Sequence, residues 1–243
     1  MLNLGKPKDR QKSLIEERGI LFMAKRQWIA KYAAGFVILL IIGGIAVYQN
    51  RFEPAAFTQA VLDASYKNIT DGYMKQTGAD QETADAVFEK NIETAMAQFT
   101  TAKLSDELTV EYRNLFAQIV KQVNYKVGEA VKEKDGSYAV VVTVRPILLF
   151  TDIYEIFRAK AQEYAETVSN RVMAGERMPT EQEMEMQLYQ LYYEILKEKT
   201  DAGLPYGEPQ KMVLHITKQK LFTYEIQKED LENLDEVLIS ENK

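Results

Sequence analysis

A run of nineteen uncharged residues near the N-terminus strongly limits what this chain can be. It extends from Tyr32 to Asn50, and its centre, FVILLIIGGIAV, would be apolar on every face of a helix. At a rise of about 1.5 Å per residue such a helix is roughly 28 Å long, close to the ~30 Å hydrocarbon core of a bilayer. A surface helix of a soluble domain needs a polar stripe, which this run lacks. We therefore predict a transmembrane helix over residues 28–50.

The residues around this run agree with a membrane span and indicate its orientation. Trp28 and Tyr32 lie at one end and Tyr48 at the other, as interfacial aromatic residues do. Residues 1–31 contain 8 Lys/Arg and 3 Asp/Glu, a net charge of +5, which leaves −11 for the remainder because the whole chain carries −6. The positive-inside rule then places the N-terminus in the cytoplasm and the acidic remainder outside the membrane.

A cleaved signal peptide is the main alternative to an anchor. Such peptides have apolar segments of about 7–15 residues followed by small residues at the cleavage site. Here the run is longer, and it ends in the bulky sequence AVYQN. We favour an uncleaved single-pass signal anchor, and the sequence leaves cleavage open. The predicted organisation is a cytoplasmic basic tail (1–27), a span (28–50) whose partner is the lipid bilayer, and an extracytoplasmic domain (51–243) at the cell membrane.

Composition excludes several functional classes. The chain contains no cysteine, which excludes disulfides, thiolate catalysis and cysteine-based zinc sites. The acidic balance beyond the span argues against nucleic-acid binding, because phosphate contacts require clustered Lys and Arg. No Gly-x-Gly pattern marks a nucleotide loop, so we predict no cofactor.

The pattern of apolar residues after the span predicts an α+β fold. Apolar residues spaced three to four apart predict helices that begin near Pro54, Asp80, Ser105 and Thr180, with further helices before Gly175 and over 231–238. Alternating stretches at 125–131 and 138–144, separated by Asp135-Gly136, predict a hairpin, and 212–217 with 221–226 predicts a second. Because helices and strands segregate along the chain, we expect helices packed on a mostly antiparallel sheet of two hairpins, preceded by one transmembrane helix.

Three segments carry a family resemblance. They are FTQAVLDASYK (57–67), YKVGEA (125–130) and YAVVVTVRPI (138–147). In this order the chain resembles, over roughly residues 54–230, an uncharacterised family of exported domains of Gram-positive bacteria, most of them lipoproteins. The resemblance implies a cell-surface domain of unknown function with a cystatin-like, nuclear-transport-factor-like superfold, and it supplies no catalytic residues. This chain differs by using a membrane span where many members have a lipid-modified cysteine.

Tyrosines are the best candidates for a site. Tyr189, Tyr192 and Tyr193 crowd one predicted helix, and Tyr206 follows in a Gly/Pro-containing loop. Aromatic clusters line ligand pockets and interfaces, but packing at the edge of the core is the more common explanation. His215 is the only histidine, which excludes a multi-histidine metal site.

The sequence favours a binding role over chemistry. We expect a membrane-anchored extracytoplasmic domain, not an enzyme, that binds a small ligand or an envelope protein. The alternative is a structural or assembly component of a cell-envelope complex, such as a type IV secretion or conjugation machine. A third reading is a hydrolase that uses tyrosine and carboxylate groups. A deep cavity with converging polar groups would favour ligand binding or catalysis, and a flat exposed apolar patch would favour assembly.

Overall fold

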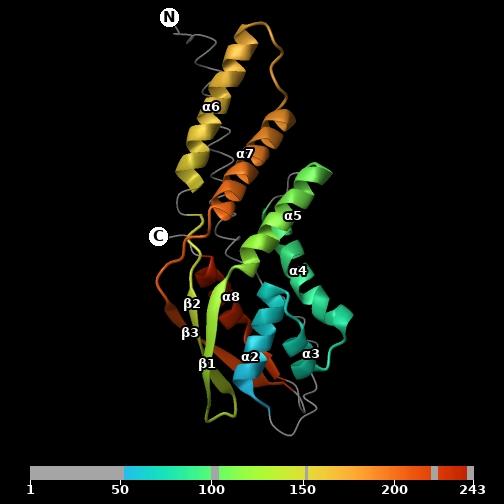
Figure 1. Cartoon of the computed structure of the whole chain (residues 1–243), viewed down its shortest axis with the longest axis vertical. Coiled ribbons are helices and arrows are strands. Elements are labelled where there is room, and N and C mark those ends of the chain that lie inside the picture. The colour runs from blue at the N-terminus through green and yellow to red at the C-terminus, as the bar shows by residue number, and fades with distance from the viewer. Residues whose placement is uncertain (1–51, 100–103, 151–152, 220–223, 240–243) are drawn as a thin grey trace, which may run out of the picture.

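Figure 1 shows the computed structural model of the chain, which describes residues 52–99, 104–150, 153–219 and 224–239. The predicted cytoplasmic tail (1–27) and membrane span (28–50) lie outside these residues. Among the helices of the described part, none is long and apolar enough to cross a membrane.

One antiparallel sheet joins the two predicted hairpins. Its strands lie in the order β1-β2-β3-β4 within the described residues. β2 and β3 also pair antiparallel, so the second strand of the first hairpin contacts the first strand of the second hairpin. The α+β class is therefore confirmed. The strand bounds are β1 Asn124–Lys132, β2 Tyr138–Arg145, β3 Gln210–Lys218 and β4 Tyr224–Ile226.

Helices pack on one face of this sheet and enclose the main core. α2 packs against β1 and β2, and α8 packs against β2 and β3. The alternate side chains of β2 that face them, Val140, Val142 and Val144, are fully buried. The bounds are α2 Pro54–Leu62, a π-helical turn η1 Asp63–Lys67, α3 Asp71–Thr77, α4 Gln81–Phe99, α5 Asp106–Lys121 and α8 Lys228–Leu238.

Short polar side chains begin the helices where the sequence predicts them. Asp80 Oδ1 accepts a hydrogen bond from the Thr83 amide at 2.8 Å. Ser105 Oγ accepts one from the Leu108 amide at 3.2 Å. Each cap satisfies an amide that the first turn of a helix leaves without an intrahelical partner.

Two long helices extend from the body of the molecule as an antiparallel pair (Figure 1). They are α6 (Ile153–Met173) and α7 (Glu181–Asp201), and α6 packs against α7. Gly175, with a φ of 101°, follows the end of α6, a conformation that glycine adopts without strain. We name residues 153–201 the arm.

The arm is inserted between β2 and β3, and a short neck connects it to the sheet. In the neck, the Gly207 amide donates to the Pro146 carbonyl at 2.8 Å, and the Leu148 amide donates to the Pro205 carbonyl at 2.9 Å. The two chains thus stay paired beyond the end of the β2–β3 ladder, which reduces the freedom of the arm at its attachment.

Candidate functional site

The distal half of the arm has its own small core. Ala165 and Val168 of α6 pack with Met184 of α7, and all three are at most 8% exposed. Tyr164, Val172 and Met178 cover this cluster, which is separate from the main core of the domain. The distal arm is therefore held together by contacts between its two helices.

The turn at the tip of the arm is closed by a capping box. Thr180 Oγ1 accepts a hydrogen bond from the Glu183 amide, and Glu183 Oε2 accepts one from the Thr180 amide at 2.7 Å. Arg177 forms a bidentate ion pair with Glu183, with N···O distances of 2.9 and 2.5 Å. The hydrogen bond from Arg177, followed by those from Thr180, lowers the pKa of Glu183 to about 2. The tip is thus an ordered turn with a charged surface.

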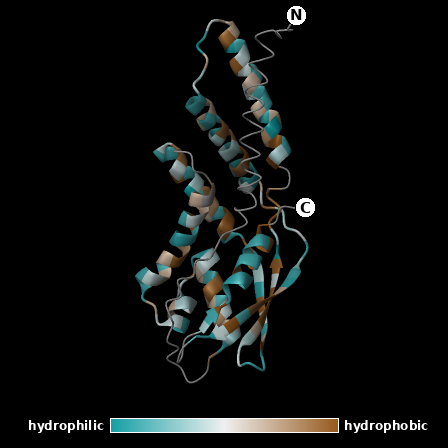
Figure 2. Cartoon of the chain, turned by 180° about the vertical axis from the view of Figure 1, so that it is seen from behind, coloured by the Kyte–Doolittle hydropathy of each residue, from teal (hydrophilic) through white to brown (hydrophobic). Residues whose placement is uncertain are grey.

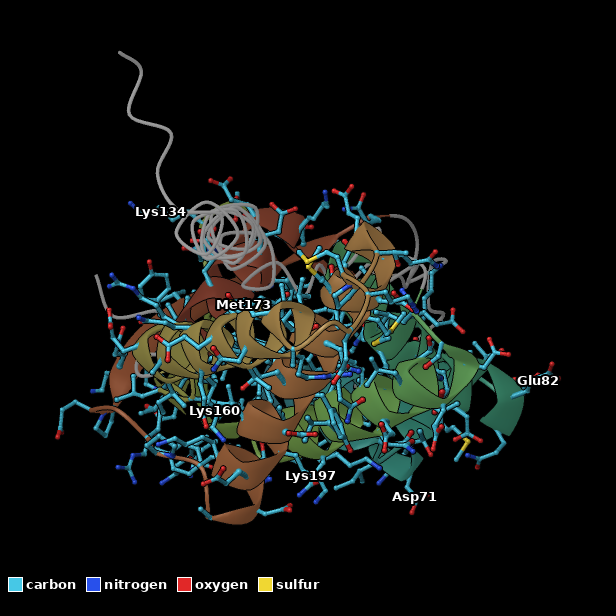
Figure 3. All side chains as sticks on the ribbon, turned by 90° about the horizontal axis from the view of Figure 1, so that it is seen from above. Asp71, Glu82, Lys134, Lys160, Met173 and Lys197 are labelled. Carbon is cyan, nitrogen blue, oxygen red and sulfur yellow. The ribbon has the colours of Figure 1, made fainter. Side chains whose placement is uncertain are left out.

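The distal arm is acidic. Residues 163–187 contain six glutamates and two arginines, a net charge of −4. Both arginines are paired, Arg171 with Glu176 and Arg177 with Glu183. Met173 lies at the tip with 62% of its surface exposed, an unusual position for a large apolar side chain. Figure 2 shows hydrophilic and hydrophobic residues interspersed along both helices, and Figure 3 labels Met173.

Two of the four tyrosines that the sequence suggests as site residues are buried at the base of the arm. Tyr189 is 5% exposed and Tyr192 is 9% exposed. Their rings lie 6.0 and 6.3 Å from that of Phe99, and Tyr112 Oη donates a 2.6 Å hydrogen bond to the Tyr189 carbonyl. These contacts hold α7 against α4 and α5. Burial leaves little of either ring for a ligand.

The other two tyrosines keep part of their surface. Tyr193 packs edge-on against the Tyr112 ring at 5.4 Å, and partial burial, then the nearby Glu111 carboxylate, raises the pKa of Tyr193. Tyr206 lies in the neck, where its hydroxyl donates to the Gln122 carbonyl at 2.6 Å. The structure therefore brings three of the tyrosines together at the arm base and places Tyr206 in the neck. Their role in binding stays a prediction.

Sequence reasoning missed two tyrosine–aspartate pairs inside the body. Tyr66 of η1 donates a hydrogen bond to Asp235 of α8, and Tyr125 of β1 donates one at 2.6 Å to Asp63 of η1. Burial, reinforced by the Asp235 charge, raises the pKa of Tyr66 well above its usual value. Burial and the hydrogen bond to Asp63 likewise raise the pKa of Tyr125. Both phenols therefore remain protonated donors at neutral pH, and they tie the π-helical turn to β1 and α8.

One sequence signal could have revealed the buried aspartate. Asp235 adjoins Leu231, Leu234 and Leu238 on the apolar face of α8, so helical spacing turns it inward. The sequence around Asp63 does not predict its pairing with Tyr125, because Asp63 begins the π-helical turn η1. A π-helical turn depends on packing from distant elements, and such turns are frequent at functional sites.

His215 and two glutamates of α7 are further polar side chains of the kinds that bind metal ions. Asp230 Oδ2 lies 2.9 Å from His215 Nδ1 and accepts a hydrogen bond from the His215 backbone amide at 2.6 Å. These two contacts connect the start of α8 to β3. Glu181 and Glu185 are exposed in the first turns of α7. Over the part of the chain that the structure describes, no three His, Asp or Glu side chains are grouped so that they could hold a metal ion.

Comparison with known proteins supports the fold and gives no information on an activity. No family model matches the sequence, and no curated protein matches it. The structure is similar to the crystal structure of a "putative lipoprotein (ycdA)" from Bacillus subtilis, with a TM-score of 0.52 and 15% sequence identity. The match covers 77% of this chain and 56% of the other, so this chain spans little more than half of that protein. The expected likeness to lipoprotein-type domains is confirmed in part, at the level of the fold, and the cystatin-like superfold stays a prediction.

Proposed function

We propose that this protein is a membrane-anchored extracytoplasmic domain, without chemistry of its own, that binds an envelope protein through the distal arm. The observation that carries the proposal is the arm itself. Its distal half extends beyond the main core, has its own small core, and ends in a capped turn. Such a projection contributes little to the stability of the body, which is enclosed by the other helices.

The surface of the distal arm indicates the kind of partner. Its net charge of −4 fits a basic surface, because complementary charge steers association and selects among partners. The exposed Met173 adds an adaptable apolar contact, which methionine provides at binding surfaces. We therefore expect a protein with a basic patch beside a small apolar pocket.

The extracytoplasmic placement has two supports. One is the uncharged run at 28–50, with the basic residues that precede it. The other is the fold shared with the "putative lipoprotein (ycdA)" of Bacillus subtilis, since lipoproteins are attached to the surface of a membrane. A transmembrane helix and a covalently attached lipid are two different anchors that would hold similar domains at the same membrane surface.

Site-specific photo-crosslinking in cells tests the proposal. A benzophenone amino acid is placed at Met173 and, as a control of similar exposure, at Val110 of α5 (62% and 56% exposed). We expect an adduct with an envelope protein from position 173 and none from position 110. Adducts from both positions, or from neither, would overturn the proposal.

Charge reversal then tests the chemistry of the contact. Combining the position-173 crosslinker with Glu163→Lys and Glu185→Lys should reduce the adduct, because both glutamates are exposed on the arm. Glu82→Lys on α4 makes the same change outside the arm (Figure 3) and should leave the adduct unchanged. Equal loss with all three substitutions would point to a general charge effect and count against the arm.

An assembly role is the second candidate, and the sheet face opposite the described helices favours it. Val131 of β1 and Val213 of β3 lie on the face opposite the helices, 62% and 43% exposed. This small apolar surface fits a component of an envelope complex, such as a secretion or conjugation machine. A crosslinker at Val131 distinguishes the two. An adduct from position 131 alone would support assembly through the sheet and overturn binding through the arm.

A further inference from the structure

We infer that the domain stands upright on the membrane, with an aromatic clamp holding the anchored end of the chain at one end of the sheet and the arm leaving from the other. This inference rests on the proposed membrane anchor. It adds that the tip of the arm is presented far from the bilayer, toward a partner that lies away from the membrane surface.

The clamp consists of Phe52, Phe57, Tyr138 and Tyr224. Phe52 stacks on Tyr224 with a centroid distance of 3.6 Å and an interplanar angle of 3°. Its ring also lies 5.6 Å from that of Tyr138 and 5.5 Å from that of Phe57. In the sequence only Arg51 separates Phe52 from the end of the predicted span. The second residue after the predicted span is therefore packed directly onto the domain.

The sequence contains no Gly/Ser-rich linker between the predicted span and α2. α2 begins at Pro54, and the Phe57 amide donates to the Glu53 carbonyl at 2.9 Å. Gly/Ser-rich segments are what allow domains to tumble on their anchors, and residues 51–53 contain neither glycine nor serine. The orientation of the domain is thus coupled to that of the span.

The arm leaves from the opposite end of the sheet. Tyr138, which the clamp holds, is the first residue of β2, and Tyr224 is the first residue of β4. The neck follows Arg145, the last residue of β2, and precedes Gln210, the first residue of β3. Figure 1 shows the start of α2 and the β1–β2 turn at one end of the long axis and the arm at the other.

The lengths of β2 and α6 give an estimate of the distance from the anchor point to the tip of the arm. The 8 residues of β2 span about 27 Å. The 21 residues of α6 span about 31 Å. Placed along one axis, these parts put the tip on the order of 60 Å from the anchor point.

Charge favours the same orientation. The distal arm carries a net charge of −4, and the surface of a membrane rich in anionic lipid has a negative potential. An arm lying on such a bilayer would be repelled, whereas an upright arm lies beyond the screening length of about 8–10 Å.

Quenching by nitroxide lipids tests the inference in the full-length protein. The chain contains no cysteine, so single cysteines for fluorophores can be added without other changes. We use Lys134→Cys in the β1–β2 turn and Met173→Cys at the tip (Figure 3), in vesicles of phosphatidylcholine and phosphatidylglycerol with headgroup nitroxides. We expect quenching at position 134 and its loss at position 173. Equal quenching at the two positions, or stronger quenching at 173, would overturn the upright orientation.

Loosening the clamp tests its part in the orientation. Phe52→Ala should make the probe at 173 susceptible to quenching, because the domain can then tilt. Met96→Ala on α4 removes a half-buried apolar side chain away from the clamp and should leave the probe unquenched. If Phe52→Ala fails to fold, a Gly/Ser insertion between Asn50 and Arg51 uncouples the domain without altering it. The insertion is tested in vesicles of phosphatidylcholine alone, whose uncharged surface does not repel the acidic arm. A probe that stays unquenched there would overturn the clamp.

Flotation of the vesicles separates this inference from the proposed function. Protein that fails to float would overturn the membrane anchor and the orientation together. Protein that floats with position 173 quenched would overturn the orientation alone and leave binding through the arm to the crosslinking result.

Discussion

Two tyrosines fix the π-helical turn that follows α2. Tyr66 reaches Asp235, 169 residues away in the sequence, and Tyr125 reaches Asp63 across 62 residues. Asp235 is 1% exposed, and a buried carboxylate is tolerated only where donors satisfy it. These pairs connect the turn to α8 on one side and to β1 on the other. Their role is to hold these three elements in register, and the raised pKa of each phenol keeps the donor proton in place.

Replacing Tyr66 with phenylalanine tests this role. Tyr66→Phe keeps the ring and removes a donor to a buried carboxylate, so we expect a loss of about 1–3 kcal/mol in the free energy of unfolding. Urea unfolding of the full chain in detergent, followed by circular dichroism, measures it. Tyr193→Phe removes a hydroxyl from a half-exposed ring and should change stability by less than about 0.5 kcal/mol. Equal effects of the two substitutions would contradict the role of the Tyr66–Asp235 pair.

At the scale of elements, the arm is one helical hairpin with two kinds of support. Its base is packed into the main core through Phe157, Tyr189 and Tyr192. Its distal half relies on the small cluster of Ala165, Val168 and Met184. Segments with few buried apolar contacts open more easily than those within a core, so the two halves should differ in stability.

Placing a charge in the small core tests this division. Val168→Asp buries a carboxylate among apolar side chains, so we expect amide exchange in residues 163–185 to rise by at least about tenfold while β3 stays protected. Thr167→Asp introduces the same group at the neighbouring exposed position and should leave exchange unchanged. Hydrogen exchange measured by mass spectrometry reads out both regions. Faster exchange in β3 as well would show that the arm and the body unfold as one unit.

At the scale of the whole molecule, the start of α2 and the acidic arm lie at opposite ends of the described part of the chain (Figure 1). In the sequence, the basic residues precede the predicted span, and Phe52 of the aromatic clamp follows it after one residue. This order fits a protein that is held at a membrane and reaches a partner away from it.

Protease treatment of intact cells, in which the cell wall is made permeable, tests this topology. The exported domain should be degraded because the positive-inside rule places it outside, whereas a tag on residues 1–27 should survive on a short membrane fragment. Immunoblotting against both ends measures the outcome. A full-length chain that resists protease in intact cells, yet is degraded after lysis, would contradict the predicted orientation.

The sequence by itself determined the identity of most elements. Helix starts at Asp80, Ser105 and Thr180 follow from side chains that cap an amide three residues away, and the Asp135-Gly136 turn likewise depends on adjacent residues. The end of β2 before Pro146 follows from the missing amide of proline. Each of these features is local, so periodicity and a few residue types suffice to predict it.

Only the tertiary structure decided how these elements are combined. The separation of the arm from the body, the burial of Tyr189 and Tyr192, and the Tyr66–Asp235 pair depend on contacts between residues far apart in the sequence. Helical spacing placed the tyrosines at the edge of an apolar face but did not reveal which element would cover it. The physical reason is that burial is a property of two surfaces, and a sequence pattern describes only one of them.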